Sequence, residues 1–503
     1  MSLWIVLLSY LPIVIVLAYV LKDVYGKHPF VSHSVGFKAR RALNWVPLGL
    51  TYAFLYMARY NLTVSKNALG DLMTKEDFGT IFFFGTITYA VSFLINGPLT
   101  DKFGGKKAIL AGAIGAAVAN ILMGFATYGI LMKKIAVPLT LTFSILYSIN
   151  MYFQSFGAVA IVKVNAAWFH VRERGTFGGI FGILISLGLF FAFDWCAAIV
   201  KATLASVDTT SMSWLQNLLR DILGITNSPI DQTWWVFFVP AFILVFFAIL
   251  DLLIIRDEPA GAGLQNIYTA DASAGEDDKP FKLGEILSKI LTNKIILTIA
   301  FIEFCTGVLR NGVMHWYSIF TNEYPKLAGT TEVLPVHAFM KNNWGLMLML
   351  AGVFGGMFGG TISDRLFQSR RGPVAALLYG LLFVGALLMA FTVRGDQILL
   401  AFAVIGMSFA VIGTHGVLSG TSTMDFGGKR AAGTAVGLID GFVYLGTGVQ
   451  SLSLGFITTR NWDWWPIFLI PFTLLGFFLA MRIWKAIPVP KARPEQAKSV
   501  SAT

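Results

Sequence analysis

The chain of 503 residues is 56% hydrophobic and 13% charged, and its 38 lysines and arginines exceed its 27 aspartates and glutamates to give a net charge of +11. A surface this apolar would aggregate in water, so most of the chain must lie in lipid, which excludes a soluble multidomain protein, a disordered chain and a coiled coil. The basic residues are spread between apolar runs, which argues against a nucleic-acid-binding stripe.

Apolar segments long enough to cross a bilayer, which takes about 20 residues, follow one another along the chain. Thirteen are expected, at residues 3–21, 42–60, 78–100, 108–131, 136–162, 175–200, 233–255, 294–320, 341–363, 373–393, 398–424, 431–455 and 463–485. The first lacks the basic start and the small-residue cleavage site of a signal peptide, so we interpret it as an uncleaved extra helix. The remaining twelve predict an all-α membrane protein built from two six-helix halves.

The distribution of lysine and arginine between the loops predicts the orientation of the chain. If residues 22–41 are cytoplasmic, 25 of the 38 basic residues lie in cytoplasmic loops, 10 lie outside, and Arg59, Lys163 and Arg310 lie within spans. Basic residues concentrate on the cytoplasmic side of membrane proteins. We therefore expect a multi-pass protein of the cell membrane, inner or plasma, with a cytoplasmic C-terminus.

A polar stretch with linker composition divides the chain near its middle, beginning with Asp257-Glu258-Pro259. The predicted organisation is an extra transmembrane helix at 1–30, an N-terminal half at 31–255, a cytoplasmic linker at 256–290, a C-terminal half at 291–487 and a cytoplasmic tail at 488–503.

Two features recur in both halves at similar spacing. The first feature is a turn with Gly97, Asp101 and Lys102, which recurs 263 residues later as Gly360, Asp364 and Arg365. The second is an arginine within a span, Arg59, which recurs 251 residues later as Arg310. In each turn we expect glycine to allow close helix approach, aspartate to accept hydrogen bonds at a neighbouring helix N-terminus, and the basic residue to hold the loop inside. The repeats predict a duplicated six-span unit with two gating loops.

The paired turns resemble those of the major facilitator superfamily. Within it the chain is similar to the organophosphate:phosphate antiporter family over residues 52–61, 153–175, 309–316 and 429–446. The most specific pieces are the two arginine segments and the run Lys429-Arg430-Ala431-Ala432-Gly433-Thr434-Ala435. The resemblance implies a twelve-helix core of the major-facilitator type, and it implies that Arg59 and Arg310 form a phosphate clamp.

Arg59 and Arg310 also stand out without any resemblance. An arginine at the bilayer centre costs about 2.5–3.5 kcal/mol on insertion scales, so two in equivalent spans need compensation. A phosphate dianion would supply it, because its oxygens match the guanidinium fork. The alternatives are that each arginine snorkels to an interface, most readily Arg59 at the outer end of its span, or pairs with an acid such as Glu303.

Further polar side chains within the spans are candidates for substrate binding. Tyr52 and Tyr56 lie seven and three residues before Arg59 and so share its helical face. The other candidates are Gln154, Lys163, His415, Asp440 and Tyr444. Packing is the alternative for the tyrosines and the histidine, and snorkelling is the alternative for Lys163; Asp440 could bind a sugar hydroxyl, exchange a proton or pair with a base.

Three positions depart from the family's glycerol phosphate branch. Phe93, Ile185 and Gly307 stand where that branch has a lysine, a histidine and a tyrosine. The resemblance therefore supports a sugar phosphate as well as glycerol 3-phosphate.

The predicted function is secondary active transport, in which an organophosphate (a sugar phosphate or glycerol 3-phosphate) is exchanged for inorganic phosphate by alternating access. The sequence has no Walker loop, which argues against ATP-driven transport, and it has neither metal-ligand spacing nor a Gly-x-Ser-x-Gly elbow. Because no nucleophile and base pair is present either, we expect no enzyme activity, cofactor or metal. The expected partners are the organophosphate, inorganic phosphate and the lipid bilayer, without nucleic acid, and the chain is expected to be a monomer. The alternatives are a membrane sensor of phosphorylated sugars and a proton-coupled symporter of another organic anion.

Overall fold

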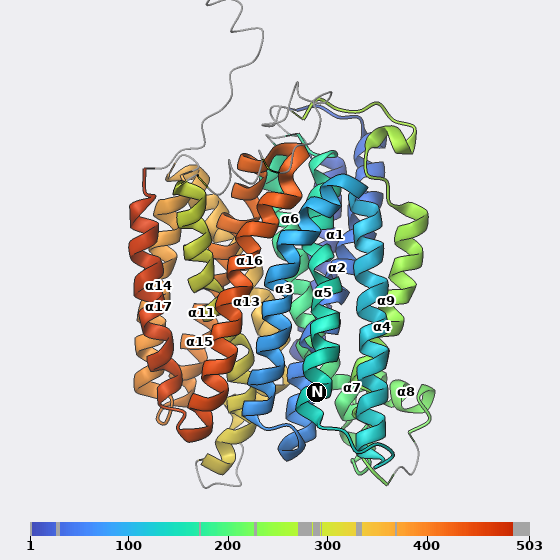
Figure 1. The fold of residues 1–503 in the computed structure, drawn as a ribbon, viewed down its shortest axis with the longest axis vertical. Helices are drawn as coiled ribbons and strands as arrows, with labels where there is room; N and C mark the ends of the chain where they lie inside the picture. The colour runs from blue at the N-terminus through green and yellow to red at the C-terminus, as the bar shows by residue number, and fades with distance from the viewer. Residues whose placement is uncertain are drawn as a thin grey trace, which may run out of the picture.

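The computed structural model describes residues 3–26, 31–170, 173–225, 229–269, 284, 292, 294–327, 334–367 and 370–485, and for residues 3–10, 174–179, 181, 211, 326, 361, 364, 365 and 420–432 it describes the backbone alone. Within these ranges all regular secondary structure is helical. The helices form two bundles side by side, the first half of the chain in blue to green and the second in yellow to red (Figure 1). The predicted all-α fold class is confirmed.

Helix α1 (Leu3–Tyr25) precedes two sets of long helices. The first set comprises α2 (Val35–Leu69), α3 (Lys75–Phe103), α4 (Gly105–Leu131), α5 (Leu139–Ala166), α6 (Arg174–Phe190), which continues through the π-helical turn η3 (Phe191–Trp195) into α7 (Cys196–Ala202), and α9 (Trp235–Ile254). The second set comprises α11 (Lys294–Leu327), α13 (Trp344–Arg365), α14 (Arg371–Thr392), α15 (Gln397–His415), followed by the π-helical turn η6 (Gly416–Thr421), α16 (Ser422–Arg460) and α17 (Trp464–Arg482).

The shorter helices are α8 (Trp214–Ile222) and α12 (Pro335–Asn342), with 3-10 turns η1 (Gly70–Leu72), η4 (Thr209–Ser211) and η5 (Pro259–Ala262). Each predicted apolar segment overlaps a helix of the structure. Within the described residues ten helices are long and apolar enough to cross a membrane, or eleven if α12 and α13, bent by 72° at their junction, count as one span.

Helix α2 is longer than the predicted segment 42–60. The Ser34 hydroxyl accepts a hydrogen bond from the backbone N–H of Phe37 at 3.2 Å and caps the start of the helix. The helix ends at Leu69 and is followed by Gly70, where φ is +57°. The apolar window was too short because the last turns of α2 are polar but buried against protein, as at Asn61 and Ser65. Arg59 therefore lies in the interior of α2, ten residues before the last residue of the helix, rather than near the end of the helix.

Helices α3 and α16 form the main seam between the two bundles, and α6 packs against α13 in a second seam. At the first seam a Cβ on Gly97 would lie 2.7 Å from the carbonyl oxygen of Gly433, so the predicted close approach at Gly97 is confirmed. At Gly360 a Cβ would meet no atom of the described residues within 4 Å, so the same expectation is not confirmed there. In the second half the close approach is between Gly355 and Gly413, where a Cβ on Gly413 would lie 2.7 Å from the Gly355 oxygen.

The two ends of the bundles are identified by contacts between loops. At one end, called here the linker end, the Asp257 carboxylate accepts a hydrogen bond from the backbone N–H of Lys106 at 2.7 Å, and Arg40 donates to the carbonyl of Ile254 at 2.9 Å. At the opposite end, called the far end, Lys75 of α3 forms an ion pair with Glu323 of α11 at 2.8 Å. Figure 1 has the linker end at the top.

Helix α1 is attached to the N-terminal bundle by buried charges at the linker end. The Asp23 carboxylate accepts hydrogen bonds from Arg41 at 2.5 Å and from the indole N–H of Trp45 at 3.0 Å. Arg41 also pairs with Glu173 at 3.1 Å, and His33 contacts the same carboxylate at 3.1 Å. The extra helix is therefore tied to the start of α6 through one shared arginine.

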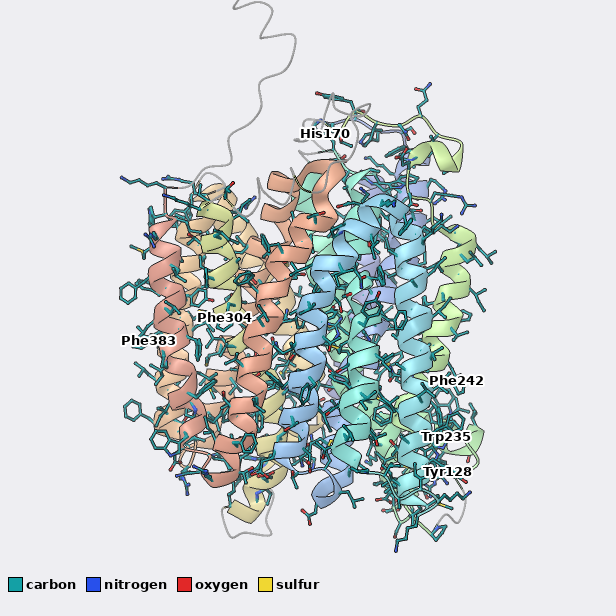
Figure 2. The ribbon with its side chains drawn as sticks, viewed as in Figure 1. Tyr128, His170, Trp235, Phe242, Phe304 and Phe383 are labelled. Atoms are coloured by element: carbon teal, nitrogen blue, oxygen red, sulfur yellow. The ribbon has the colours of Figure 1, made fainter. Side chains whose placement is uncertain are left out.

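Apolar side chains cover the outer faces of the bundles, as expected for helices in lipid. Figure 2 shows Phe242 and Phe383 pointing away from the two bundles on opposite sides. Tyr128 and Trp235 lie near the far end, where aromatic side chains are enriched at a membrane interface.

Candidate functional site

Arg59 lies at the centre of a buried cluster of phenols. The guanidinium donates hydrogen bonds from Nη1 to the Tyr444 hydroxyl at 2.7 Å and from Nη2 to the Tyr89 hydroxyl at 2.7 Å. It also donates from Nη2 to Oε1 of Gln154 at 3.1 Å. The rings of Tyr56 and Tyr89 lie 4.6 and 4.5 Å from its central carbon, a cation–π arrangement. Side chains from α2, α3, α5 and α16 thus meet at one arginine.

Arg310 of α11 joins the same cluster through Tyr444. Its Nη2 donates to the Tyr444 hydroxyl at 3.3 Å, and its Nε has no hydrogen-bond partner among the described residues. The Tyr444 ring lies 5.9 Å from the Arg310 central carbon. The repeat-related arginines of the two halves therefore share one tyrosine hydroxyl, which has two acceptor lone pairs. We call Arg59, Arg310, Tyr56, Tyr89, Tyr444 and Gln154 the arginine–tyrosine cluster.

The structure supports neither alternative to anion binding, snorkelling or pairing with an acid, for Arg59 or for Arg310. Arg59 is 0% exposed and Arg310 3% exposed, which argues against snorkelling. Neither has a carboxylate within ion-pair distance among the described side chains, because Glu303 pairs with His415 at 2.7 Å instead. Two buried positive charges held by neutral phenols create a strong positive potential, and a unit negative charge about 4 Å away would gain roughly 4 kcal/mol at an effective dielectric near 20.

Polar side chains on neighbouring helices hold the backbone turn that carries Arg59. Tyr147 donates to the Arg59 carbonyl at 3.2 Å, while Asn150 and Asn120 donate to the Ala58 carbonyl at 3.0 and 2.9 Å. Carbonyls inside a helix already accept a helical hydrogen bond, so these extra donors fix how α2 is rotated. Sequence reasoning missed all three residues and Tyr89, and their signal is a polar group inside an otherwise apolar span.

The other candidates on α2 and α5 divide into two groups. Tyr52 and Tyr56 are buried with ring centroids 5.3 Å apart at 88°, on the face of α2 that carries Arg59. Lys163 lies nine residues beyond Gln154, roughly 13 Å along the α5 axis, and its ammonium pairs with Asp101 at 2.8 Å. The structure thus brings Tyr52, Tyr56 and Gln154 to the arginines and places Lys163 with the first gating loop.

The first gating loop links the two halves at the seam. The Asp101 carboxylate accepts hydrogen bonds from the backbone N–H and the hydroxyl of Thr434 on α16, both at 3.0 Å. Lys102 is exposed beside the Phe103 ring. In the second loop the backbone of Asp364 and Arg365 belongs to α13, and their side chains lie outside the described residues.

His415 and Asp440 belong to a separate polar group in the C-terminal bundle. His415 Nδ1 lies 2.7 Å from the carboxylate of Glu303, and Ser419 donates to Asp440 at 2.6 Å. Arg310 is among the charged neighbours of Asp440. This group therefore adjoins the arginine–tyrosine cluster.

Two of the departures from the glycerol phosphate pattern have a packing explanation. A Cβ on Gly307 would lie 1.8 Å from the carbonyl oxygen of Val443, so α11 and α16 touch where a tyrosine would otherwise stand. Phe93 packs its ring 5.9 Å from that of Tyr444 and 4.5 Å from that of Tyr89. Both residues support the position of Tyr444.

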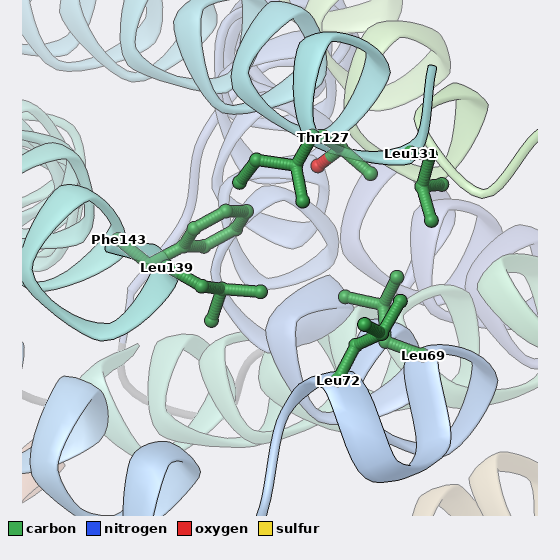
Figure 3. A pocket seen from close by; sticks show the side chains of 7 residues that line it. Leu69, Leu72, Thr127, Leu131, Leu139 and Phe143 are labelled. Carbon is green, nitrogen blue, oxygen red and sulfur yellow. The ribbon is translucent and has the colours of Figure 1, made fainter. Parts of the chain in front are cut away.

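A small pocket at the far end has different chemistry. It lies between the ends of α2 and α4 and the start of α5 (Figure 3), and its lining is apolar apart from Thr127. Leu69, Leu131 and Phe143 are typical of that lining. It offers no charge to an anion. In addition, the described residues hold no cluster of three or more metal-ligating side chains.

The sequence of this chain is similar to those of known membrane proteins. Residues 48–451 match the family described as Major Facilitator Superfamily. The chain is 28% identical to the glycerol-3-phosphate transporter of Bacillus subtilis (strain 168), over 88% of this chain and 93% of that protein. It is 26% identical to the membrane sensor protein UhpC of Escherichia coli (strain K12), over 84% and 86%. It is 25% identical to the hexose-6-phosphate:phosphate antiporter of the same strain, over 83% and 82%.

Solved structures of low sequence identity share the fold. A bacterial homologue of the human lysosomal transporter Spinster, in an inward-facing and unoccupied conformation, matches with a TM-score of 0.61 at 12% identity, over 90% of this chain and 99% of that one.

Proposed function

Since this chain belongs to the Major Facilitator Superfamily and, within it, to the organophosphate:phosphate antiporter family, we propose that it is a secondary active transporter that exchanges an organophosphate for inorganic phosphate. It works as a multi-pass protein of the plasma membrane, with its C-terminus in the cytoplasm and as a monomer. The moving units are the halves 31–255 and 291–487, joined by the linker 256–290; the extra helix 1–30 and the tail 488–503 flank them.

The observation that carries the proposal is the pair of buried arginines, one from each half, that share the Tyr444 hydroxyl and have no carboxylate partner among the described residues. A phosphate group fits between them because it offers several acceptor oxygens and up to two negative charges. Tyr52, Tyr56, Tyr89 and Gln154 supply donors and aromatic edges around it.

Alternating access follows from where the halves touch. At the far end Thr63 lies 2.7 Å from His315, Asn67 donates to Ser318 at 3.2 Å, and Lys75 pairs with Glu323. Opening this end must break those contacts between α2 or α3 and α11. Opening the linker end must break the hydrogen bonds between Asp101 and Thr434. The site between the two ends is then reached from one side at a time.

The positive charges of the two arginines favour exchange of one anion for another over switching of the empty transporter. Two like charges that approach in a low-dielectric site repel, so closing the halves around the arginines is unfavourable until an anion neutralises them. Either phosphate or the organophosphate serves, since both carry the phosphoryl group. A bound anion therefore lowers the barrier to the switch in both directions.

The test is phosphate self-exchange in proteoliposomes. Arg59→Lys and Arg310→Lys keep a positive charge but lose the planar fork, and we expect each to lower exchange at least tenfold. Arg482→Lys, at an exposed position at the end of α17, is the matched control. Near-normal exchange in both site variants contradicts the proposal. Binding without counterflow in the wild type identifies a sensor, and uptake driven by a pH gradient without internal phosphate identifies a symporter.

A further inference from the structure

Four residues of the C-terminal bundle form a buried acidic cluster that the phosphate site does not use. Glu303 of α11 is 0% exposed, Ser419 of η6 3%, Asp440 of α16 5% and His415 of α15 6%. His415 lies against Glu303 and Ser419 against Asp440, as described above. We refer to these four residues as the acidic cluster.

The acidic cluster lies beside the arginine–tyrosine cluster and toward the linker end. Glu303 precedes Arg310 by seven residues on α11, which is two turns on one face and about 10 Å along the axis. Asp440 precedes Tyr444 by four residues on α16, which is one turn and about 6 Å. Asp440 is an electrostatic neighbour of both Arg310 and Tyr444. The two clusters therefore form the ends of one polar strip along α11 and α16.

The acidic cluster has acceptor capacity that the described protein leaves unused. An ionised carboxylate only accepts hydrogen bonds and can take about four. His415 serves Oε2 of Glu303, whereas Oε1 of Glu303 is buried without a hydrogen-bond partner among the described residues. A buried acceptor without a donor is unfavourable. We therefore expect Oε1 of Glu303 to accept a hydrogen bond from a group that binds along the polar strip.

The charges favour neutral donors over a second cation. His415 lies against Glu303 and is also a neighbour of Asp440, and Arg310 adds positive charge near Asp440. The charge of Arg310 thus offsets part of the negative charge of the cluster, and His415 occupies one oxygen of Glu303. The acceptor oxygens that have no donor are therefore matched best by neutral O–H groups that point toward them.

Resting on the proposed function, we propose that the acidic cluster is the second pole of the transport site: Glu303 and Asp440 accept hydrogen bonds from hydroxyls on the organic part of the substrate while the arginines hold its phosphate. His415 acts as a positioning residue that orients Glu303. The separation of about 6–10 Å between the poles suits a polyhydroxylated ester such as a hexose phosphate better than the shorter glycerol 3-phosphate. The poles therefore select substrate by length and hydroxyl content.

The test measures preference in phosphate-loaded proteoliposomes. For each variant, the concentrations of glucose 6-phosphate, glycerol 3-phosphate and inorganic phosphate that halve labelled phosphate uptake are determined. Glu303→Gln and Asp440→Asn replace an acceptor oxygen by an amide, and we expect the preference for glucose 6-phosphate over inorganic phosphate to fall about tenfold in each. Asp221→Asn on the exposed helix α8 is the matched control, and its preference should equal that of the wild type.

A second measurement does not depend on how the variants fold. On the wild type, deoxy analogues of glucose 6-phosphate that each lack one hydroxyl are compared as competitors, and at least one should bind about tenfold more weakly than the parent compound.

Equal competition by all analogues overturns the inference, as does an unchanged preference in both cluster variants. Equal weakening toward all three probes also overturns it, because it reports a structural role. These results leave the proposed function standing if the wild type exchanges phosphate and the arginine variants do not. Absence of exchange in the wild type rejects the proposed function instead.

Discussion

The hydroxyl of Tyr444 lies 2.7 Å from Nη1 of Arg59, so the C-terminal half supplies a hydrogen-bond acceptor to the arginine of the N-terminal half. The same hydroxyl receives a weaker hydrogen bond from Arg310 at 3.3 Å. One phenol is therefore hydrogen-bonded to both of two charges that would otherwise only repel. Its removal tests whether the pair is held ready for an anion.

We expect Tyr444→Phe to raise the apparent KM for phosphate about tenfold, because hydrogen bonds to charged groups contribute roughly 1.5–3 kcal/mol. The ring keeps its packing against Tyr89, whose centroid is 4.2 Å away, so the fold should persist. Phosphate self-exchange at varied concentration is the measurement, with Tyr25→Phe at a 69% exposed position as control. A normal KM in Tyr444→Phe would show that the hydroxyl is dispensable.

The sequence predicted more of this site than of its surroundings, for a physical reason. A charge within an apolar span is conspicuous because lipid cannot solvate it, which identified Arg59 and Arg310. Tyr89 was missed because a single phenol among apolar residues looks like packing until its partner on another helix is known. Likewise nothing local indicated that Lys163 pairs with Asp101, 62 positions earlier in the chain.

For the fold, the sequence predicted where the apolar helices lie but not how the helices contact one another. Each apolar segment predicted from hydropathy overlaps a helix, since a helix must be apolar where it meets lipid. Hydropathy misjudged α2, whose outer turns are polar and buried against protein, and it could not distinguish Gly97, where helices touch, from Gly360, where a Cβ would meet no atom of the described residues within 4 Å. Contacts between helices have no signature in the periodicity of one helix.

The ion pair between Lys75 and Glu323 should stabilise closure of the far end. Its side chains are 13% and 30% exposed, so we expect a contribution of about 0.2–1 kcal/mol, typical of partly exposed pairs. Glu323→Gln should therefore raise labelling of a cysteine placed at Ser318 by a membrane-impermeant maleimide by about 1.4- to fivefold. The background is Cys196→Ala with Cys305→Ala, since both native thiols are buried.

The swapped pair Lys75→Glu with Glu323→Lys provides the control, because it restores opposite charges and should return labelling toward the parent level. Labelling that stays constant in Glu323→Gln would mean that the pair does not favour the closed far end.

Glu173 should give the linker end a distinct dependence on pH. Burial opposes its ionisation, but hydrogen bonds from His33 and Arg41 and the charge of Arg41 outweigh it and lower the pKa of Glu173 from 4.5 to about 2. A carboxyl whose pKa is lower in the folded state stabilises the protein fully above its unfolded pKa, and this contribution is lost as the pH falls from about 4.5 toward 2.

The measurement is the thermal unfolding midpoint in detergent between pH 7 and pH 3. Glu173→Gln should have a lower midpoint than the wild type at pH 7. The gap should narrow below about pH 4.5, because Glu173 of the unfolded wild type then binds a proton while the folded protein keeps the carboxylate ionised. A constant gap across that range would indicate that the charge of Glu173 contributes nothing to the network with Arg41 and Asp23.

Gly307 should tolerate no side chain, because a Cβ there would lie 1.8 Å from the backbone oxygen of Val443, and a backbone atom cannot rotate away. Gly307→Ala must push α11 from α16 and displace Tyr444, the next residue along. We expect a midpoint lowered by several degrees and weaker phosphate exchange. Gly360→Ala is the matched control: a Cβ at that helical position meets no atom of the described part of the chain within 4 Å, and alanine there should be neutral or stabilising by up to about 1 kcal/mol. Equal midpoints for the two variants would refute the tight contact at Gly307, and with it the packing explanation for the absence of a tyrosine at that position.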